Sequence, residues 1–346
     1  MAWNLESKKF FFRGLSTLQN SGVHILDGLQ GLAVQSQDPL FVETVESLSK
    51  KLASGYPLHK ALASEGDIFS RLEVALVKVA ESSGKLHTVL ARLAEMSESR
   101  DKLRRELLAA LIYPAFVLIL CTGLLVFAPL FVFSDLLNLL RELGSDLPLV
   151  TRIYLGFSDL ILNPIVLLAL AALSVLILLR FKKAAHDPKQ RRALEEIGFA
   201  VPGLSAVLKS SAASECSEAL AICYQAGVPI LAGLRLSGSA TFSLLLQDRF
   251  LVAEEQLKSG ATLTEALRTC EVFEPMSLAL LATAEESGKV SESLFSIATQ
   301  CRAHTKDALD TFQKLLEPCL LLFMGFIVAF IAVATLAPTL NLVQAL

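Results

Sequence analysis

Residues 107–134 read LLAALIYPAFVLILCTGLLVFAPLFVFS, a run of 28 residues without a charged side chain. An α-helix rises about 1.5 Å per residue, so about 20 residues cross the hydrocarbon core of a bilayer. Two further uncharged runs follow, residues 160–179 and 318–346. Because core helices of soluble proteins seldom stay uncharged for so long, the three runs predict three transmembrane helices. For the shortest run, 160–179, a buried helix of a soluble domain is the alternative.

The composition of the whole chain agrees with a membrane protein. Of the 346 residues, 53% are hydrophobic and 19% are charged. The mean hydropathy of +0.55 is too high for an ordinary soluble domain, and such a composition excludes intrinsic disorder. The 31 basic and 34 acidic side chains nearly cancel, so no overall field favours nucleic acid. The six cysteines form no Cys-x-x-Cys pair, which argues against a zinc cluster or a thioredoxin-like motif and favours reduced, buried thiols.

Basic side chains cluster on one side of the predicted spans. They lie just before the first run, just after the second and just before the third, whereas the loop between the first two runs holds only Arg141 and Arg152. The positive-inside rule then predicts a cytoplasmic N-terminus and a periplasmic C-terminus. The first ten residues lack the apolar stretch of a signal peptide, which agrees with that orientation. The expected organisation is a first cytoplasmic segment (1–106), transmembrane helices at 107–133, 160–179 and 315–338, a periplasmic loop (134–159), a second cytoplasmic segment (180–314) and a periplasmic tail (339–346).

The two cytoplasmic segments resemble each other in sequence. A shift of 205 residues, which drops to 204 after one residue is lost near Ser64 to Asp67, aligns several glycines, a Glu-x-Ser-Gly-Lys string and a proline. The aligned pairs include Gly22 with Gly227, Val23 with Val228, Gly28 with Gly233, Gly55 with Gly260, Glu81 with Glu285, Ser83 with Ser287, Gly84 with Gly288, Lys85 with Lys289 and Pro114 with Pro318. The sequence therefore predicts an internal duplication.

The glycines indicate how each copy folds. Each aligned glycine follows one helical apolar pattern and precedes another, where we expect a helix to end in a left-handed residue that glycine adopts without strain. Pro229 is expected in the first turn of the next helix, and Thr262 to Glu265 has the spacing of a capping box. Apolar residues recur every three or four positions, and β-hairpin signals are absent. The predicted fold class is all-α, with each copy a bundle of about six short helices whose last helix continues into a membrane span.

No stretch of the sequence has the pattern of a catalytic, cofactor or metal site. Gly84-Lys85 and Gly288-Lys289 lack the earlier glycine and the following Ser or Thr of a phosphate-binding loop. No two of the five histidines lie at the spacing of a metal-ligand pair. No acid or base lies inside the three uncharged runs, which counts against an ion or proton pathway. We therefore expect no enzyme activity, no cofactor and no metal.

Glu81 and Glu285 each lie one turn before a helix-ending glycine. Their carboxylates are expected on a solvated face or on the N-terminal amides of the next helix, and a contact surface for a partner is the alternative. Pro114 and Pro318 lie at equivalent points a few residues inside the first and third spans. A tolerated kink, a working hinge and a helix-packing role are all open for these prolines.

With these strings the chain resembles the inner-membrane platform proteins of type II secretion and type IV pilus machines, the F component of the former and its pilus-assembly counterpart, PilC. The resemblance rests on Leu15 to Leu26 with Gly22 and Val23, on Gln225 to Leu231 with Gly227, Val228 and Pro229, on the two Glu-x-Ser-Gly-Lys strings, on Tyr113-Pro114, on Val201 to Leu204 and on Glu317-Pro318. The family usually has glycine before the motif glutamate, where this chain has Ala80 and Ala284.

The resemblance implies a non-enzymatic scaffold in the bacterial inner membrane. Its expected partners are a cytoplasmic assembly ATPase, prepilin-like or pseudopilin subunits, other inner-membrane components of the machine, the lipid bilayer and a second copy of the chain, with no direct contact to nucleic acid. A membrane-anchored adaptor and a transport subunit are the competing classes. Secretion, pilus extension and DNA uptake use related platforms, and the sequence does not choose among them.

Overall fold

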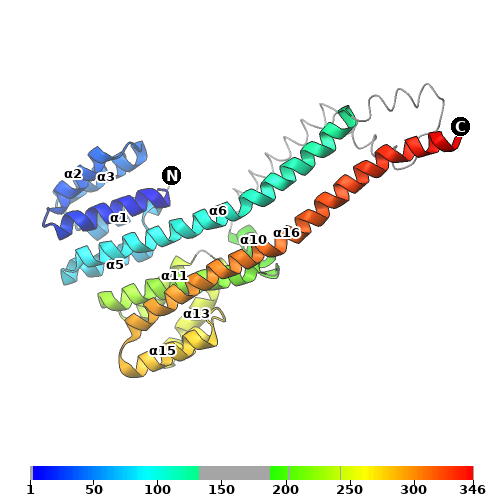
Figure 1. Ribbon diagram of the computed structural model, residues 1–346. Coiled ribbons are helices and arrows are strands. Elements are labelled where there is room, and N and C mark those ends of the chain that lie inside the picture. Colours follow the sequence, from blue (N-terminus) through cyan, green and yellow to red (C-terminus); the bar gives the residue numbers. More distant parts are fainter. Residues whose placement is uncertain (1–2, 132–187, 202, 242, 346) are drawn as a thin grey trace. The chain divides into compact units, whose positions relative to one another are not determined.

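The computed structural model describes residues 3–131, 188–201, 203–241 and 243–345, and within these ranges it contains helices and no strands (Figure 1). The chain is thus all-helical over the described residues. The predicted periplasmic loop (134–159), the predicted span at 160–179 and the last two residues of the span at 107–133 lie outside the described residues.

Six helices and a short 3-10 turn lie in the first described range, residues 3–131. They are α1 (Leu5–Asn20), α2 (Ile25–Gln35), α3 (Pro39–Ala53), α4 (Leu58–Ala63), η1 (Gly66–Ile68), α5 (Arg71–Ser83) and α6 (Leu86–Phe131). The C-terminal half contains α10 (Pro188–Ala200), α11 (Leu204–Ala226), α12 (Ile230–Ala240), α13 (Leu244–Lys258), α14 (Leu263–Arg268), α15 (Pro275–Ser287) and α16 (Val290–Ala345).

The helix boundaries of the two halves coincide after the shift found in the sequence. Helices α2, α3 and α4 have the bounds of α12, α13 and α14 displaced by 205 residues, and α5 has those of α15 displaced by 204. The shift changes at η1 (Gly66–Ile68), within the region where one residue is lost. We call α1 to α5 with residues 86–106 of α6 the N-terminal bundle, and α11 to α15 with residues 290–309 of α16 the C-terminal bundle.

The chain divides into two compact units. One, the polar unit, contains residues 1–106 and 192–309 and so holds both bundles; the other, the apolar unit, contains residues 107–191 and 310–346. Helices α6 and α16 take part in both units. Each has an 18-residue window with a mean hydropathy of 2.4, so both are long and apolar enough to cross a membrane.

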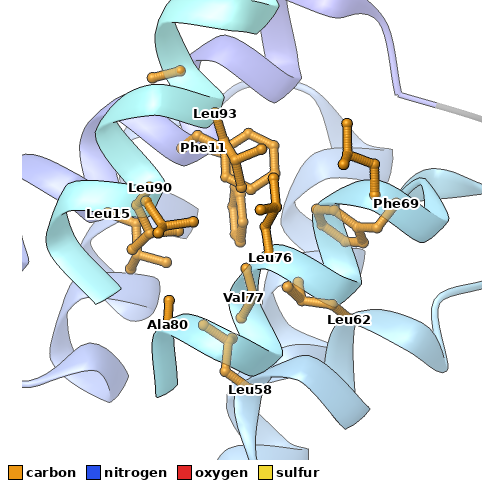
Figure 2. Close-up of a cluster of buried hydrophobic side chains, with 14 of the residues drawn as sticks. Phe11, Leu15, Leu58, Leu62, Phe69, Leu76, Val77, Ala80, Leu90 and Leu93 are labelled. Atoms are coloured by element: carbon orange, nitrogen blue, oxygen red, sulfur yellow. The ribbon is translucent and has the colours of Figure 1, made fainter. Parts of the chain in front are cut away.

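The polar unit has two cores. In the N-terminal bundle, Phe11, Leu76 and Leu93 point toward one another from α1, α5 and α6 (Figure 2), and all three side chains are fully buried. Trp3 stacks on Phe41 with ring centroids 4.7 Å apart. The core of the C-terminal bundle is built from smaller side chains, including Ala212, Cys216 and Ala253. The amphipathic spacing in the sequence is therefore used for packing in both bundles.

Six of the aligned glycines end helices with positive φ. Gly84 and Gly288 are the left-handed C-cap residues of α5 and α15, with φ of 69° and 73°. The others have φ between 77° and 97°; they are Gly22, Gly55, Gly227 and Gly260. Each follows the last helical residue or the one after it, as the sequence predicts, because only glycine adopts this conformation without strain.

Gly28 and Gly233 do not end helices, so the prediction for this pair is wrong. Both lie inside helices, in α2 and α12. A Cβ on Gly233 would lie 3.2 Å from Leu220 Cδ1 and 3.2 Å from Cys223 Cβ, so the missing side chain lets α12 approach α11. Pro229 also differs from the prediction, because it is the N-cap residue of α12 and the first helical turn starts at Ile230.

Candidate functional site

The two motif glutamates hold the start of a short helix. Glu81 accepts hydrogen bonds from the backbone N–H groups of Leu58 and His59 at 2.6 and 3.1 Å, and Nδ1 of His59 lies within hydrogen-bond distance of the same carboxylate. Leu58 and His59 are the first two residues of α4. These amides have no partner within the helix, and a carboxylate is a favourable acceptor at a helix N-terminus.

Glu285 makes the same contacts in the C-terminal bundle. Its carboxylate accepts from the backbone N–H groups of Leu263 and Thr264 at 2.7 and 3.0 Å and from the hydroxyl of Thr264. Leu263 and Thr264 begin α14, and they are the counterparts of the two residues bound by Glu81. The expectation that each glutamate binds the next helix is wrong, because α4 and α14 precede the glutamates in the chain.

The residues that follow the glutamates are open to solvent. Ser83, Gly84 and Lys85 are exposed after α5, and Ser287, Gly288 and Lys289 are exposed after α15. Within each string the carboxylate caps a helix and the glycine ends one, whereas the serine and lysine side chains are available to solvent. These exposed side chains keep open the alternative of a partner contact.

The Gly-Val-Pro string of the C-terminal bundle lies at a contact between the two bundles. Val228 is 8% exposed and belongs to the core of the N-terminal bundle, together with Ala219, Ile222 and Cys223 of α11. Its counterpart Val23 is only half-buried. The sequence aligned these two valines, but nothing in it distinguishes the one that packs against the other bundle.

A partly buried charged cluster also joins the two bundles, and no pattern in the sequence indicates it. Arg100 of α6 lies 3.6 Å from Glu215 of α11 and donates to the backbone carbonyl of Ala240. Arg302 of α16 pairs with Glu218 at 2.7 Å. Burial raises the pKa of both carboxyl groups above the ordinary value of 4.5, although the charges of Arg100 and Arg302 oppose the shift.

Two cations counted toward membrane orientation are therefore engaged inside the polar unit. Arg100 and Arg302 form ion pairs with Glu215 and Glu218, and these four side chains line a cavity of about 20 Å³. Such paired cations contribute to packing, and the prediction of orientation rests on the remaining basic residues.

The proline strings of the apolar unit come together at a larger cavity. It has a volume of about 340 Å³ and is lined by Tyr113 and Pro114 of α6 and by Glu317 of α16. Asp310 and Lys314 also line it, so the cavity has polar walls next to apolar helices. Pro114 and Pro318 both lie inside uninterrupted helices, and Pro318 itself is exposed.

The cysteines are free thiols. Five are buried, as expected, whereas Cys319 is exposed on α16, contrary to the prediction. Burial raises the pKa of Cys223 and of Cys270 to about 12, so both thiols are protonated at neutral pH and unreactive. Among the described residues no group of three His, Cys, Asp or Glu side chains has the geometry of a metal site.

Comparison with known proteins relates these features to a family. The family model for protein F of the type II secretion system matches residues 11–134 and 217–338, which is more than half of the chain. The chain belongs to the type II secretion system protein F family. The first match contains Gly22, Glu81 and Pro114, and the second contains Gly227, Glu285 and Pro318, so the family pattern falls on both halves.

Curated members of the protein F family are similar over nearly the whole length. The type II secretion system protein F of Vibrio cholerae is 28% identical over 330 residues, covering 95% of this chain and 81% of the relative. The type IV pilus assembly protein PilC of Thermus thermophilus is 27% identical over 343 residues, covering 99% and 84%. The type 4 fimbrial assembly protein PilC of Pseudomonas putida is 29% identical over 334 residues, covering 96% and 82%.

Proposed function

We propose that this protein is an inner-membrane platform of a type II secretion or type IV pilus machine. In this role it couples a cytoplasmic assembly ATPase to the extraction of pilin-like subunits from the membrane and to their polymerisation, and it catalyses no reaction itself. The observation that carries the proposal is the match of the protein F family model to both halves of the chain. Relatives named for secretion and for pilus assembly are about equally similar, so both machines are included.

The continuity of two helices supports a mechanical role. Helix α6 runs without interruption from residue 86 of the N-terminal bundle to residue 131 in the first apolar run, and α16 runs from residue 290 of the C-terminal bundle to residue 345. A helix resists bending because each residue is tied to its neighbours one turn away. Movement imposed on a bundle is therefore transmitted along these helices into the membrane.

The rigid connection can be tested with two inserts of equal length, one flexible and one helical. A seven-residue Gly-Ser insert is placed after Glu106 in α6 and after Leu309 in α16, and the matched control places seven alanine-rich helical residues at the same points. Seven residues make about two helical turns, so the control keeps the side-chain register. We expect the flexible insert to stop fibre assembly or secretion and the helical insert to retain part of it. Full assembly with the Gly-Ser insert would contradict rigid transmission.

We also propose that the chain crosses the membrane three times, with both bundles in the cytoplasm, a periplasmic loop at 134–159 and a periplasmic C-terminus. The apolar helices α6 and α16 and the uncharged run at 160–179 support three crossings. The basic residues flanking the runs support the orientation. In this arrangement the two copies of one ancestral bundle lie on the same side of the membrane.

A span exchange separates the platform from a membrane-anchored adaptor. Residues 318–338 are replaced by an unrelated apolar helix of the same length, while Asp310, Lys314 and Glu317 at the polar cavity are kept. An adaptor needs this span only as an anchor and keeps its activity, whereas a platform that receives a pilin-like helix loses it. Unchanged fibre assembly by the exchanged protein, inserted at normal levels, would favour the adaptor.

A further inference from the structure

The face of α15 that corresponds to a buried face of α5 is uncovered. On α5 the stripe Leu72, Ala75, Leu76 and Val79 is buried or half-buried. Its counterpart on α15 is the stripe Met276, Ala279, Leu280 and Thr283, and all four of these residues are exposed. These positions are spaced by three and four residues, so each set forms one continuous side of its helix. We call the exposed set the α15 stripe.

The contrast in burial is large for the two long side chains of each stripe. Leu72 and Leu76 are 1% and 0% exposed, whereas Met276 and Leu280 are 75% and 37% exposed. Both bundles have the same helices at the same spacing. Phe11, which Leu76 faces in its own bundle (Figure 2), corresponds to the smaller Cys216 in the C-terminal bundle, so part of the difference lies within the bundle. An exposed apolar stripe on one helix of a matched pair marks an interaction surface.

The contact between the two bundles is one-sided. Helix α5 contacts both α11 and α12 of the C-terminal bundle, and the core of the N-terminal bundle takes in Ala219, Ile222 and Val228 from that hairpin. The core of the C-terminal bundle contains no residue of the N-terminal bundle. The α11–α12 hairpin therefore covers α5, while within the described residues no equivalent hairpin covers α15.

The chain contains a second helical hairpin that corresponds to the one covering α5. Helices α1 and α2 are the counterparts of the α11–α12 hairpin, and the positions matching Ala219, Ile222, Cys223 and Val228 are Gly14, Thr17, Leu18 and Val23. On this side of α1–α2 Thr17 is exposed, and Gly14, Leu18 and Val23 are half-buried. Leu18 packs against the core of its own bundle, and a Cβ on Gly14 would meet Leu32 of α2, so Thr17 and Val23 carry the free part of this hairpin. The chain thus has one hairpin and one stripe that are not used against each other.

We propose that the α15 stripe of one copy binds the α1–α2 hairpin of a second copy, repeating between chains the contact that α5 makes with α11–α12 within a chain. The occupant is a second copy because its α1–α2 hairpin is the counterpart of the hairpin that covers α5, and the contact continues an interface already present. The two surfaces differ, so the contact is head-to-tail, and repeating it gives a ring or an open row of bundles. Thr17 and Gly14 are smaller or more polar than Ile222 and Ala219, so this contact is weaker than the internal one.

Cysteine cross-linking of the full chain tests the pairing. In a Cys319→Ser background, which removes the exposed native thiol, one tagged copy carries Thr17→Cys and a differently tagged copy carries Leu280→Cys. A short thiol cross-linker in membranes is expected to join the two tags only when both substitutions are present. The matched control replaces Thr17→Cys by Val34→Cys, because Val34 is 88% exposed and its counterpart Ser239 is also exposed; this pair is expected to give no product.

Two results of the cross-linking would overturn the proposal. Absence of the Thr17→Cys with Leu280→Cys product in native membranes excludes the head-to-tail contact. Cross-linking of Leu280→Cys to itself, without Thr17→Cys, shows a two-fold contact through α15 instead.

A substitution on the stripe gives an independent measurement. Met276→Lys should lower the oligomer fraction of the purified full chain at least several-fold and leave the thermal transition of the dilute, monomeric chain unchanged, because the side chain is 75% exposed. A lower transition temperature would show that the stripe is covered by its own chain. A purified chain that is monomeric with and without Met276→Lys, combined with lost assembly in cells, would assign the stripe to a different protein. Both results contradict the proposal.

Discussion

Glu285 stabilises the first turn of a helix whose first two residues precede it in the chain by 22 and 21 positions. Helix α14 has only six residues, and the backbone N–H groups of its first turn have no partner inside the helix. The backbone N–H groups at its N-terminus have two sets of acceptors. One is the capping box of Thr262 and Glu265, and the other is the carboxylate of Glu285. One side chain thereby fixes the position of α15 against α14.

Removing the charge of Glu285 should destabilise the C-terminal bundle. Glu285→Gln keeps the size of the side chain but weakens hydrogen bonds to Leu263 and Thr264, and we expect a loss of about 1–3 kcal/mol of unfolding free energy. The matched control is Glu286→Gln, since Glu286 is exposed; its effect should stay within about 0.5 kcal/mol. Denaturant unfolding of the full chain in detergent measures both. Equal effects of the two substitutions would rule out the capping role.

Gly227 should tolerate only residues that accept a left-handed backbone. Its φ is 85°, and a Cβ placed on it would meet no atom within 4 Å, so the cost of substitution comes from the backbone alone. Gly227→Val should cost about 1–2 kcal/mol of stability, and Gly227→Asn clearly less, because asparagine visits this region more readily. Thermal unfolding of the two variants distinguishes them. An undiminished transition for Gly227→Val would disprove the backbone account.

Residue roles could be predicted from sequence where they depend on nearby residues. The positive φ of Gly84 and Gly288 follows from a helical pattern that stops at a glycine. The partner of Glu81 could not be predicted, because α4 reaches it only after the bundle has folded. Gly28 was misassigned for the same reason, since a glycine inside a helix and one that ends it look alike without the neighbouring helix.

At the level of elements, the two bundles conserve ion-pair positions while exchanging the charges. Arg13 of α1 pairs with Glu98 of α6 at 2.7 Å. At the corresponding positions Glu218 of α11 pairs with Arg302 of α16, also at 2.7 Å. Because both signs reverse together, the attraction between the two positions is preserved. This agreement supports the shared origin of the bundles.

The buried carboxylate between the bundles should make stability depend on pH. Burial raises the pKa of Glu215 above 4.5, against the opposing charge of Arg100. A carboxyl whose folded-state pKa is raised contributes stability below the unfolded pKa, and this contribution is lost as the pH rises through the folded pKa. Wild type should therefore lose stability relative to Glu215→Gln as the pH rises above 4.5 and through the raised folded-state pKa. Thermal unfolding at several pH values measures this difference, and a constant difference would contradict it.

The sequence predicted helix positions better than helix contacts. The bounds of α12 to α14 follow from those of α2 to α4 by the shift of 205 residues, because spacing and capping residues are local signals. The pairing of Arg100 with Glu215 joins residues 115 positions apart, and periodicity carries no information on such a contact. The sequence therefore predicts that all basic residues before the spans mark the cytoplasmic side of the membrane. Arg100, however, pairs with Glu215 inside the polar unit.

For the molecule as a whole, the platform account requires both bundles to lie on the cytoplasmic side of the membrane. Only then can one cytoplasmic motor act on both α6 and α16. Ser83 and Ser287 are suitable positions to examine this, because they are exposed and occupy equivalent places in the two bundles. The third position is a cysteine appended after Leu346, on the predicted periplasmic tail.

Thiol labelling in intact cells tests this arrangement most directly. In a Cys319→Ser background, single cysteines from Ser83→Cys, from Ser287→Cys or appended after Leu346 are exposed to a maleimide that passes the outer membrane but not the inner membrane. We predict that the appended cysteine is labelled in intact cells, whereas the cysteines at positions 83 and 287 are labelled only after the inner membrane is permeabilised. Labelling of either bundle in intact cells, or protection of the appended cysteine, would contradict the account.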